Sequence, residues 1–148
     1  MKNLEQILNS EPIFLGEWSG SKKFGIITDF EGISITEAEY KATEAPYKCV
    51  ECWIEYKAKM KAALEKWEPI KILFASYDLG NWEGDAFVLF SENGKLYEVN
   101  AGHCSCYGLE NQWEPEEVFS PEIKKRLIDG TFGGNDFKSE LKTFLGIK

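Results

Sequence analysis

The four cysteines of this 148-residue chain lie in two close pairs, a spacing at which thiolates can share one metal ion. Two residues separate Cys49 from Cys52, and one residue separates Cys104 from Cys106. Four thiolates complete the tetrahedral coordination of a structural Zn²⁺ ion. A zinc site formed by Cys49, Cys52, Cys104 and Cys106 is therefore one hypothesis. Apart from this hypothesis, the sequence predicts no metal and no cofactor.

The alternative for the first pair is a place in the hydrophobic core. Cys49 and Cys52 fall on the apolar face of a helix predicted over 47–68, where an unpaired cysteine behaves as a small hydrophobe. The first residues lack the apolar segment of a signal peptide, and no run of about 18 apolar residues predicts a membrane span. Since a cytoplasmic protein keeps its thiols reduced, we expect buried thiols rather than a disulfide.

The second cysteine pair adjoins the single histidine of the chain, His103. A neighbouring imidazole can lower the pKa of a thiol and so activate it as a nucleophile. Glu98 or Glu110 would orient the imidazole. An active loop of His103, Cys104 and Cys106 would then make the protein a hydrolase or transferase. A packed loop without chemistry is the alternative, because adjacent residues rarely present their side chains to each other.

Charge is unevenly distributed along the chain. Twenty-five acidic residues against 17 basic ones give a net charge of −8, which argues against a protein that binds nucleic acid by neutralising phosphates. Residues 76–93 and 109–122 contain carboxylates but no Lys or Arg, whereas the chain after residue 122 is more basic. An acidic surface of this kind either keeps a small protein soluble or docks on a basic groove of another protein.

Aromatic residues near these carboxylates favour the docking hypothesis, because interfaces are enriched in Trp and Tyr anchors. The chain contains no glycine-rich phosphate loop and no Ser-His-Asp signature, so an ordinary enzyme is not expected. The predicted binding surface consists of Trp82, Tyr107, Glu110, Trp113, Glu114, Glu116 and Glu117.

Hydrophobic periodicity and turn residues predict the elements that must position these side chains. Helices are expected over 3–10 and 47–68, from the Ser120-Pro121 pair to Gly130, and over a C-terminal segment that buries Phe137, Leu141, Phe144 and Leu145; a capping box of Thr36 and Glu39 begins another short helix. Strands are expected over 13–15, 24–30, 70–77, 86–90 and 96–99, followed by a loop over 100–108 and a flexible joint over 130–134.

Two hairpins follow from this assignment. The strand over 13–15 pairs with that over 24–30, and the strands over 86–90 and 96–99 flank Asn93-Gly94, which suits a type I′ turn. We expect a single α+β domain over 1–148, with a meander of four to six mostly antiparallel strands, one long amphipathic helix over 47–68 packed on a face of the sheet, and short terminal helices.

Four segments in the second half of the chain, between residues 84 and 117, form a recognisable block: GDAFVLF, GKLYEVN, HCSCYGLE and QWEPEE. On these segments the chain resembles a family of small uncharacterised phage and prophage proteins. The family has no settled activity, so the resemblance implies an origin rather than a mechanism. It implies a small accessory protein in the host cytoplasm, which binds a host or defence-system protein.

The sequence therefore predicts a non-enzymatic, acidic phage protein that acts by binding, for instance by inhibiting a host nuclease or another defence protein. No direct contact with nucleic acid or membrane is expected, and a homo-oligomer is compatible with the sequence. One alternative is a thiol- or zinc-dependent activity at residues 103–106. The other is a protein that sequesters a small, nucleotide-like ligand, with Tyr107 and Trp113 in the pocket.

Overall fold

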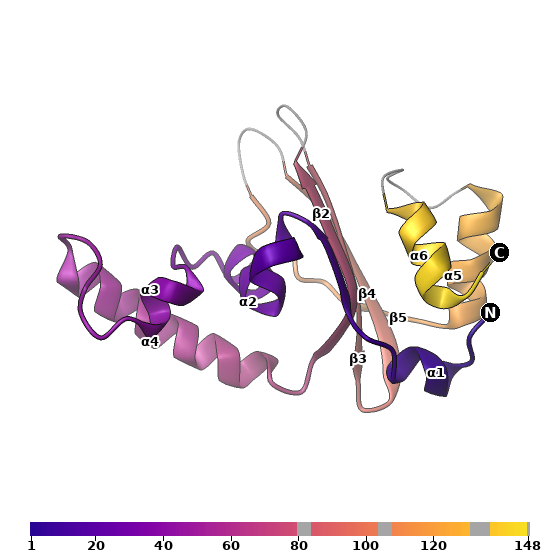
Figure 1. Ribbon diagram of the computed structural model, residues 1–148, viewed down its shortest axis with the longest axis horizontal. Helices are drawn as coiled ribbons and strands as arrows, with labels where there is room; N and C mark the ends of the chain where they lie inside the picture. The colour runs from indigo at the N-terminus through magenta and orange to yellow at the C-terminus, as the bar shows by residue number, and fades with distance from the viewer. Residues whose placement is uncertain (80–83, 104–107, 131–136, 148) are drawn as a thin grey trace.

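The computed structural model describes residues 1–79, 84–103, 108–130 and 137–147. Within these ranges a five-stranded sheet lies between two groups of helices, α2, α3 and α4 on one side and α1, α5 and α6 on the other (Figure 1). The elements in chain order are α1 Leu4–Leu8, β1 Ile13–Gly16, α2 Trp18–Glu31, α3 Glu37–Lys41, α4 Val50–Trp67, β2 Lys71–Leu79, β3 Gly84–Glu92, β4 Lys95–His103, β5 Glu116–Val118, α5 Ser120–Asp129 and α6 Lys138–Leu145.

The strands lie in the order β1-β2-β3-β4-β5, and every neighbouring pair except β1 and β2 is antiparallel. This arrangement confirms an α+β fold with a mostly antiparallel meander. The turn between β3 and β4 is at Asn93 and Gly94, which have φ angles of 55° and 78°. Positive φ at both central residues is what a type I′ turn requires, so the second predicted hairpin is confirmed.

Both faces of the sheet are buried because alternate residues of each strand enter different cores. On β3, Val88 and Phe90 join the core that includes α2 and α4, whereas Phe87 and Leu89 join the core that includes α5 and α6. The second core also contains the predicted apolar face of the C-terminal helix: Phe137, Leu141, Phe144 and Leu145. The sheet therefore separates two hydrophobic cores.

The strand predicted over 24–30 is wrong, because these residues belong to helix α2. Its residues Phe24, Ile26, Ile27 and Phe30 are all buried. A helix buried on several sides does not show the one-sided pattern from which helices are recognised in sequence. The first predicted hairpin is therefore wrong as well, and β1 pairs in parallel with β2 instead.

The predicted amphipathic helix forms as α4, with Trp53, Met60, Ala63 and Trp67 buried. Figure 1 shows it extending away from the sheet, and its main contacts are with α2 and α3. Helix α4 therefore does not pack across the sheet as predicted, because α2 covers much of this face of the sheet. Cys49 is the N-cap residue of α4, so the helix begins three residues later than predicted.

Three smaller expectations can be checked at element ends. The Thr36 and Glu39 capping box is present at the start of α3. Helix α5 has Phe119 rather than Ser120 as its N-cap and ends as predicted at Gly130, with φ 73°. Strand β4 continues to His103, so the loop predicted over 100–108 is wrong for residues 100–103, and residues 104–107 lie outside the described residues. Most of the joint predicted over 130–134 lies outside the described residues.

Candidate functional site

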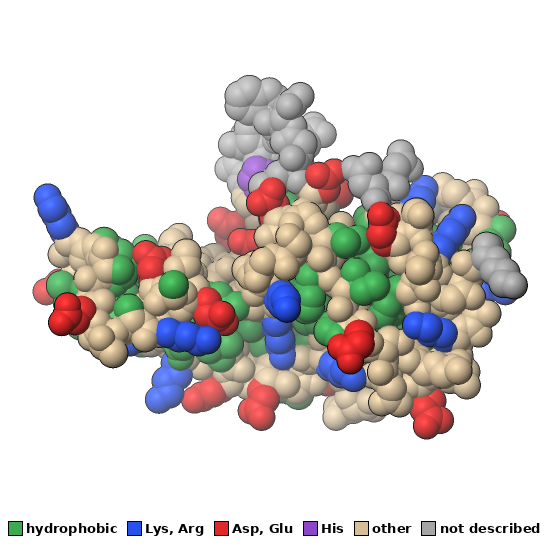
Figure 2. Space-filling view, in the orientation of Figure 1, with side chains coloured by type: hydrophobic (Ala, Val, Ile, Leu, Met, Phe, Trp, Pro, Cys, Tyr) green, Lys and Arg blue, Asp and Glu red, His purple; other side chains and the backbone are tan. Residues whose placement is uncertain are grey.

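An open cavity of about 690 Å³ lies between α2, the segment that leads into α3, and the ends of β2 and β4. We call it the acidic cavity, because five carboxylates line it and its described lining contains no Lys or Arg: Glu17, Asp29, Glu37, Glu39 and Glu110. Apolar lining comes from Phe24, Ile33, Ile35 and Leu109. Figure 2 shows acidic side chains gathered beside the single histidine of the chain.

The junction of β1 and α2 places the first two carboxylates. Gly16 has a φ angle of 67°, and a Cβ atom there would overlap the carbonyl oxygen of Tyr77. The next residue, Glu17, donates its backbone N–H to that same oxygen at 2.9 Å. The residue after Glu17, the buried Trp18, donates its indole N–H to Asp29 Oδ2 at 2.8 Å. Close approach of β1 to β2 thus brings Glu17 and Asp29 to one side of the cavity.

Glu110 lines the cavity next to Gly32, the C-cap residue of α2. A Cβ atom on Gly32 would lie 3.2 Å from Glu110 Cβ, so the glycine leaves room for this side chain. A Cβ atom on Gly108 would lie 2.7 Å from Glu110 Oε2 and 3.7 Å from His103 Cδ2. The carboxylate of Glu110 and the ring of His103 therefore share one corner of the acidic cavity.

The side chain of Gln112 holds this corner together. Its Nε2 donates to the carbonyl oxygens of Gly102 at 2.8 Å and Gly108 at 2.7 Å, and its Oε1 accepts from the Gly102 N–H at 3.0 Å. His103 follows Gly102 directly. Its Nδ1 is buried and has no hydrogen-bond partner among the residues that the structure describes.

Burial and neighbouring carboxylates raise the pKa values of two groups in the cavity. Burial raises the pKa of Asp29, and the charges of Glu17 and Glu110 add to this, against the opposing effects of the Trp18 hydrogen bond and of His103. Burial, together with Asp29, Glu17 and Glu110, raises the pKa of Tyr77 to about 12. The contributions of Glu17 and Glu110 show that a further negative charge is disfavoured in the cavity.

The predicted binding residues do not all meet at this cavity. Glu110 lines it, whereas Glu114, Glu116 and Glu117 are exposed and are not among its described lining residues. Glu117 lies 3.8 Å from Lys95, so it is not uncompensated as the sequence predicted. Trp82 and Tyr107 lie outside the described residues, and their part in binding stays a prediction.

Trp113 is half-buried against the core of the α2 side. Its ring centroid lies 4.2 Å from that of Trp67, 4.9 Å from Phe30 and 5.2 Å from Phe90. These contacts give Trp113 a packing role in the fold. A role in binding would therefore have to use the part of the side chain that is still exposed.

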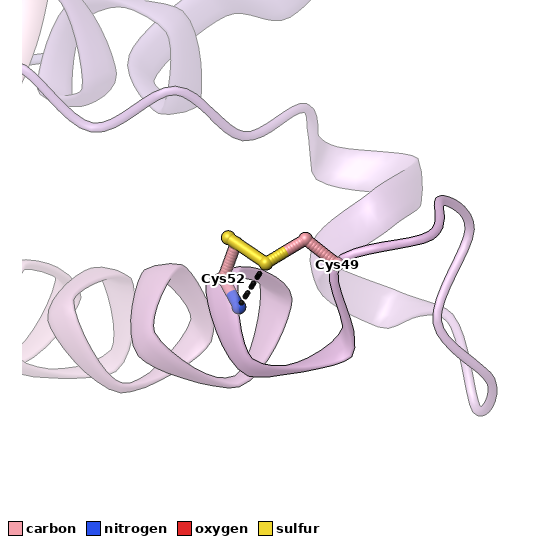
Figure 3. The surroundings of a disulfide bond; sticks show 2 residues. All are labelled: Cys49 and Cys52. Carbon is pink, nitrogen blue, oxygen red and sulfur yellow. Dashed lines mark hydrogen bonds between the residues drawn. A yellow bond between two sulfur atoms is a disulfide. The ribbon is translucent and has the colours of Figure 1, made fainter.

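The prediction that Cys49 and Cys52 are buried thiols is wrong. Cys49 is exposed, Cys52 is half-buried, and the two form a disulfide (Figure 3). Their Cα atoms are 5.2 Å apart, within the range that a disulfide spans, because both belong to the first turn of one helix. The other two members of the hypothetical zinc site and of the active loop, Cys104 and Cys106, lie outside the described residues.

Sequence reasoning missed Glu17, Asp29 and the cavity position of Tyr77. The sequence predicts a strand around Asp29 and gives no sign that the Asp29 carboxylate accepts a hydrogen bond from Trp18. One available signal was Trp18 itself, because a buried indole N–H requires an acceptor.

Among the described residues, no helix combines the length and apolarity needed to cross a bilayer. Within the same residues, no group of three or more His, Cys, Asp or Glu side chains is placed to hold a metal ion. No family model, curated protein or solved structure matches the chain.

Proposed function

We propose that the protein acts by binding, and that its acidic cavity receives a basic side chain of a partner protein. The observation that carries the proposal is the set of five carboxylates around an open cavity whose described lining contains no Lys or Arg. Such a cavity concentrates negative potential and attracts cations. This proposal keeps the predicted mode of action and places it mainly at Glu110 and its neighbours.

The apolar lining supports a basic side chain over an inorganic cation. Lys and Arg have long aliphatic stems that pack on apolar surface while their charged ends reach polar groups. Phe24, Ile33 and Ile35 provide such a surface beside the carboxylates. Arg is the better fit, because its planar guanidinium pairs with carboxylates through two parallel hydrogen bonds.

The partner class follows from the phage resemblance, which implies a host or defence-system protein. In this proposal the exposed carboxylates Glu114, Glu116 and Glu117 attract a basic partner surface and speed association, whereas the cavity holds one side chain of that partner. Charges at the rim of an interface act mostly on association rate and salt dependence. A nucleotide-like ligand fits less well, because its phosphates would face five carboxylates.

A thiol-dependent activity at His103 is the second candidate. The observation that favours it is the buried Nδ1 atom of His103, which lacks a partner among the described residues. The residue itself lines the cavity, as does Glu110. In the neutral tautomer that carries its proton on Nε2, this nitrogen can accept a proton. Loss of thiol reactivity in His103→Gln, measured at Cys104 and Cys106, would support this candidate.

The binding proposal is tested with an arginine-containing peptide and the same peptide carrying neutral citrulline. Calorimetry compares the wild-type protein with two isosteric triple variants, Glu17→Gln/Asp29→Asn/Glu110→Gln in the cavity and Glu114→Gln/Glu116→Gln/Glu117→Gln outside it. Each variant removes three charges. We expect the cavity variant to lose about tenfold or more in affinity for the arginine peptide, and the outer variant about threefold or less.

Equal affinity for the citrulline peptide, or equal losses in the two variants, would contradict the proposal. Capture from a host lysate with the wild type and the cavity variant extends the comparison to natural partners. A partner that both forms retain equally would place binding elsewhere on the protein.

A further inference from the structure

The two cysteines at the start of α4 form a chemical site separate from the acidic cavity. Neither Cys49 nor Cys52 is among the described residues that line the cavity. Figure 3 shows the disulfide at the first turn of the helix, with Cys49 at the point where the chain enters it. Cys49 is exposed, whereas Cys52 is half-buried.

The two sulfur atoms differ in their surroundings. Cys49 is the N-cap of the 18-residue helix α4, and its Sγ accepts the backbone N–H of Cys52 at 3.2 Å. The positive end of a helix and a donated N–H both favour a thiolate over a thiol. On reduction, Cys49 is therefore the cysteine that is both accessible and activated. Cys52 lies behind it within the same turn.

A purely structural role explains this disulfide poorly. Only two residues lie between its cysteines, so the bond removes little conformational entropy from the unfolded chain. The first turns of α4 are also held by other contacts. The indole N–H of Trp53 donates to the carbonyl oxygen of Glu39 at 2.8 Å, and the Lys57 ammonium lies 4.4 Å from the centre of the Trp53 ring.

We propose that Cys49 and Cys52 form a thiol–disulfide exchange site, with Cys49 as the attacking cysteine and Cys52 as the resolving one. The substrate class is a disulfide, R–S–S–R′, either of a small thiol compound or of another protein. Val50 and Ile54, on the same helix, have exposed apolar side chains that a polypeptide substrate could contact beside the site.

The exchange proceeds in two steps. In the reduced protein, the Cys49 thiolate attacks one sulfur of R–S–S–R′, which forms a mixed disulfide between Cys49 and R and releases R′–S⁻. Cys52 then loses its proton to water and attacks the Cys49 sulfur, which forms the Cys49–Cys52 disulfide and releases R–S⁻. Two electrons pass from the two cysteines to the substrate, whose products take up protons from water.

The test uses the full chain carrying Cys104→Ser/Cys106→Ser, so that only the first pair reacts. In this background, Cys52→Ser retains the attacking cysteine and Cys49→Ser retains the resolving one. Each is mixed with glutathione disulfide, and intact mass follows the addition of one glutathione. We expect Cys52→Ser to react about fivefold or more faster than Cys49→Ser. Insulin in place of glutathione disulfide shows whether a protein disulfide is also a substrate.

A measurement without the single-cysteine substitutions keeps the proposal falsifiable if a variant does not fold. The protein with both Cys49 and Cys52 is reduced and alkylated briefly with iodoacetamide, and peptide masses show which cysteine is modified first. Preferential modification of Cys49 supports the proposal. Equal reactivity of the two cysteines would overturn it, as would a disulfide that excess dithiothreitol leaves intact in the folded protein, since that disulfide is not available for exchange.

Discussion

The guanidinium of Arg126 on α5 donates a hydrogen bond to Glu98 Oε2 on β4 at 2.6 Å. The Glu98 side chain is 6% exposed, whereas that of Arg126 is 31% exposed, so the carboxylate is the deeper member of the pair. A buried carboxylate is costly unless a cation or a hydrogen-bond donor faces it. The pair therefore connects α5 to the sheet on the side opposite the acidic cavity.

Arg126→Met is expected to lower the free energy of unfolding by about 2–4 kcal/mol, because it leaves the Glu98 carboxylate buried without its cation. Urea unfolding measures the change. Lys125→Met is the matched control, since Lys125 is exposed on the same helix. Addition of Glu98→Gln to Arg126→Met should recover part of the loss. Equal effects of the Arg126 and Lys125 substitutions would show that the buried pair contributes little.

Gly94→Val is expected to destabilise the β3–β4 hairpin by about 2 kcal/mol, because a β-branched residue resists positive φ. A Cβ atom at this position meets nothing within 4 Å, so the cost comes from the backbone alone. Gly94→Asn should therefore cost clearly less, since Asn tolerates this conformation. Thermal unfolding compares the two variants, and similar losses in both would point to an undetected steric effect.

The raised pKa of Asp29 makes stability depend on pH. Because the folded-state pKa lies above the ordinary 3.8, the folded protein binds the proton more tightly than the unfolded chain does. The stabilisation from this proton is fully present below 3.8 and is lost as pH rises through the folded-state value. Asp29→Asn keeps an oxygen that can accept from Trp18. It should therefore equal or exceed wild-type stability near about pH 7, with the advantage falling as pH falls.

Urea unfolding of both proteins across this pH range measures the effect. Glu114→Gln serves as the control, because Glu114 is exposed. An advantage of Asp29→Asn that stays constant with pH would show that ionisation of Asp29 is not its cause.

Trp113→Ala is expected to lower the free energy of unfolding by about 2–4 kcal/mol, because it removes ring contacts with Trp67, Phe30 and Phe90. Trp113→Phe should cost much less, since it keeps an aromatic ring in the cluster. Chemical unfolding gives both values, and binding is then compared only between folded proteins. A Trp113→Ala protein with wild-type stability but weakened binding would make Trp113 an interface anchor rather than a packing residue.

Elements governed by neighbouring residues could be predicted from the sequence. The turn at Asn93 and Gly94, the capping box of Thr36 and Glu39 and the end of α5 at Gly130 depend on backbone preferences and local hydrogen bonds. The one-sided apolar pattern of α4 was recognisable for a related reason, because this helix keeps one side in solvent. In each case the determining contacts lie within a few residues.

Tertiary packing decided the rest. Helix α2 is buried on several sides, so its sequence carries no helical pattern, and the parallel pairing of β1 with β2 joins residues about 60 positions apart. The acidic cavity likewise assembles carboxylates from residues 17, 29 and 110 around Tyr77 and His103. The sequence by itself determined that the chain is acidic and that Glu110 lies in an acidic segment. Only the fold decided which carboxylates meet, because long-range burial and not sequence proximity sets their distances.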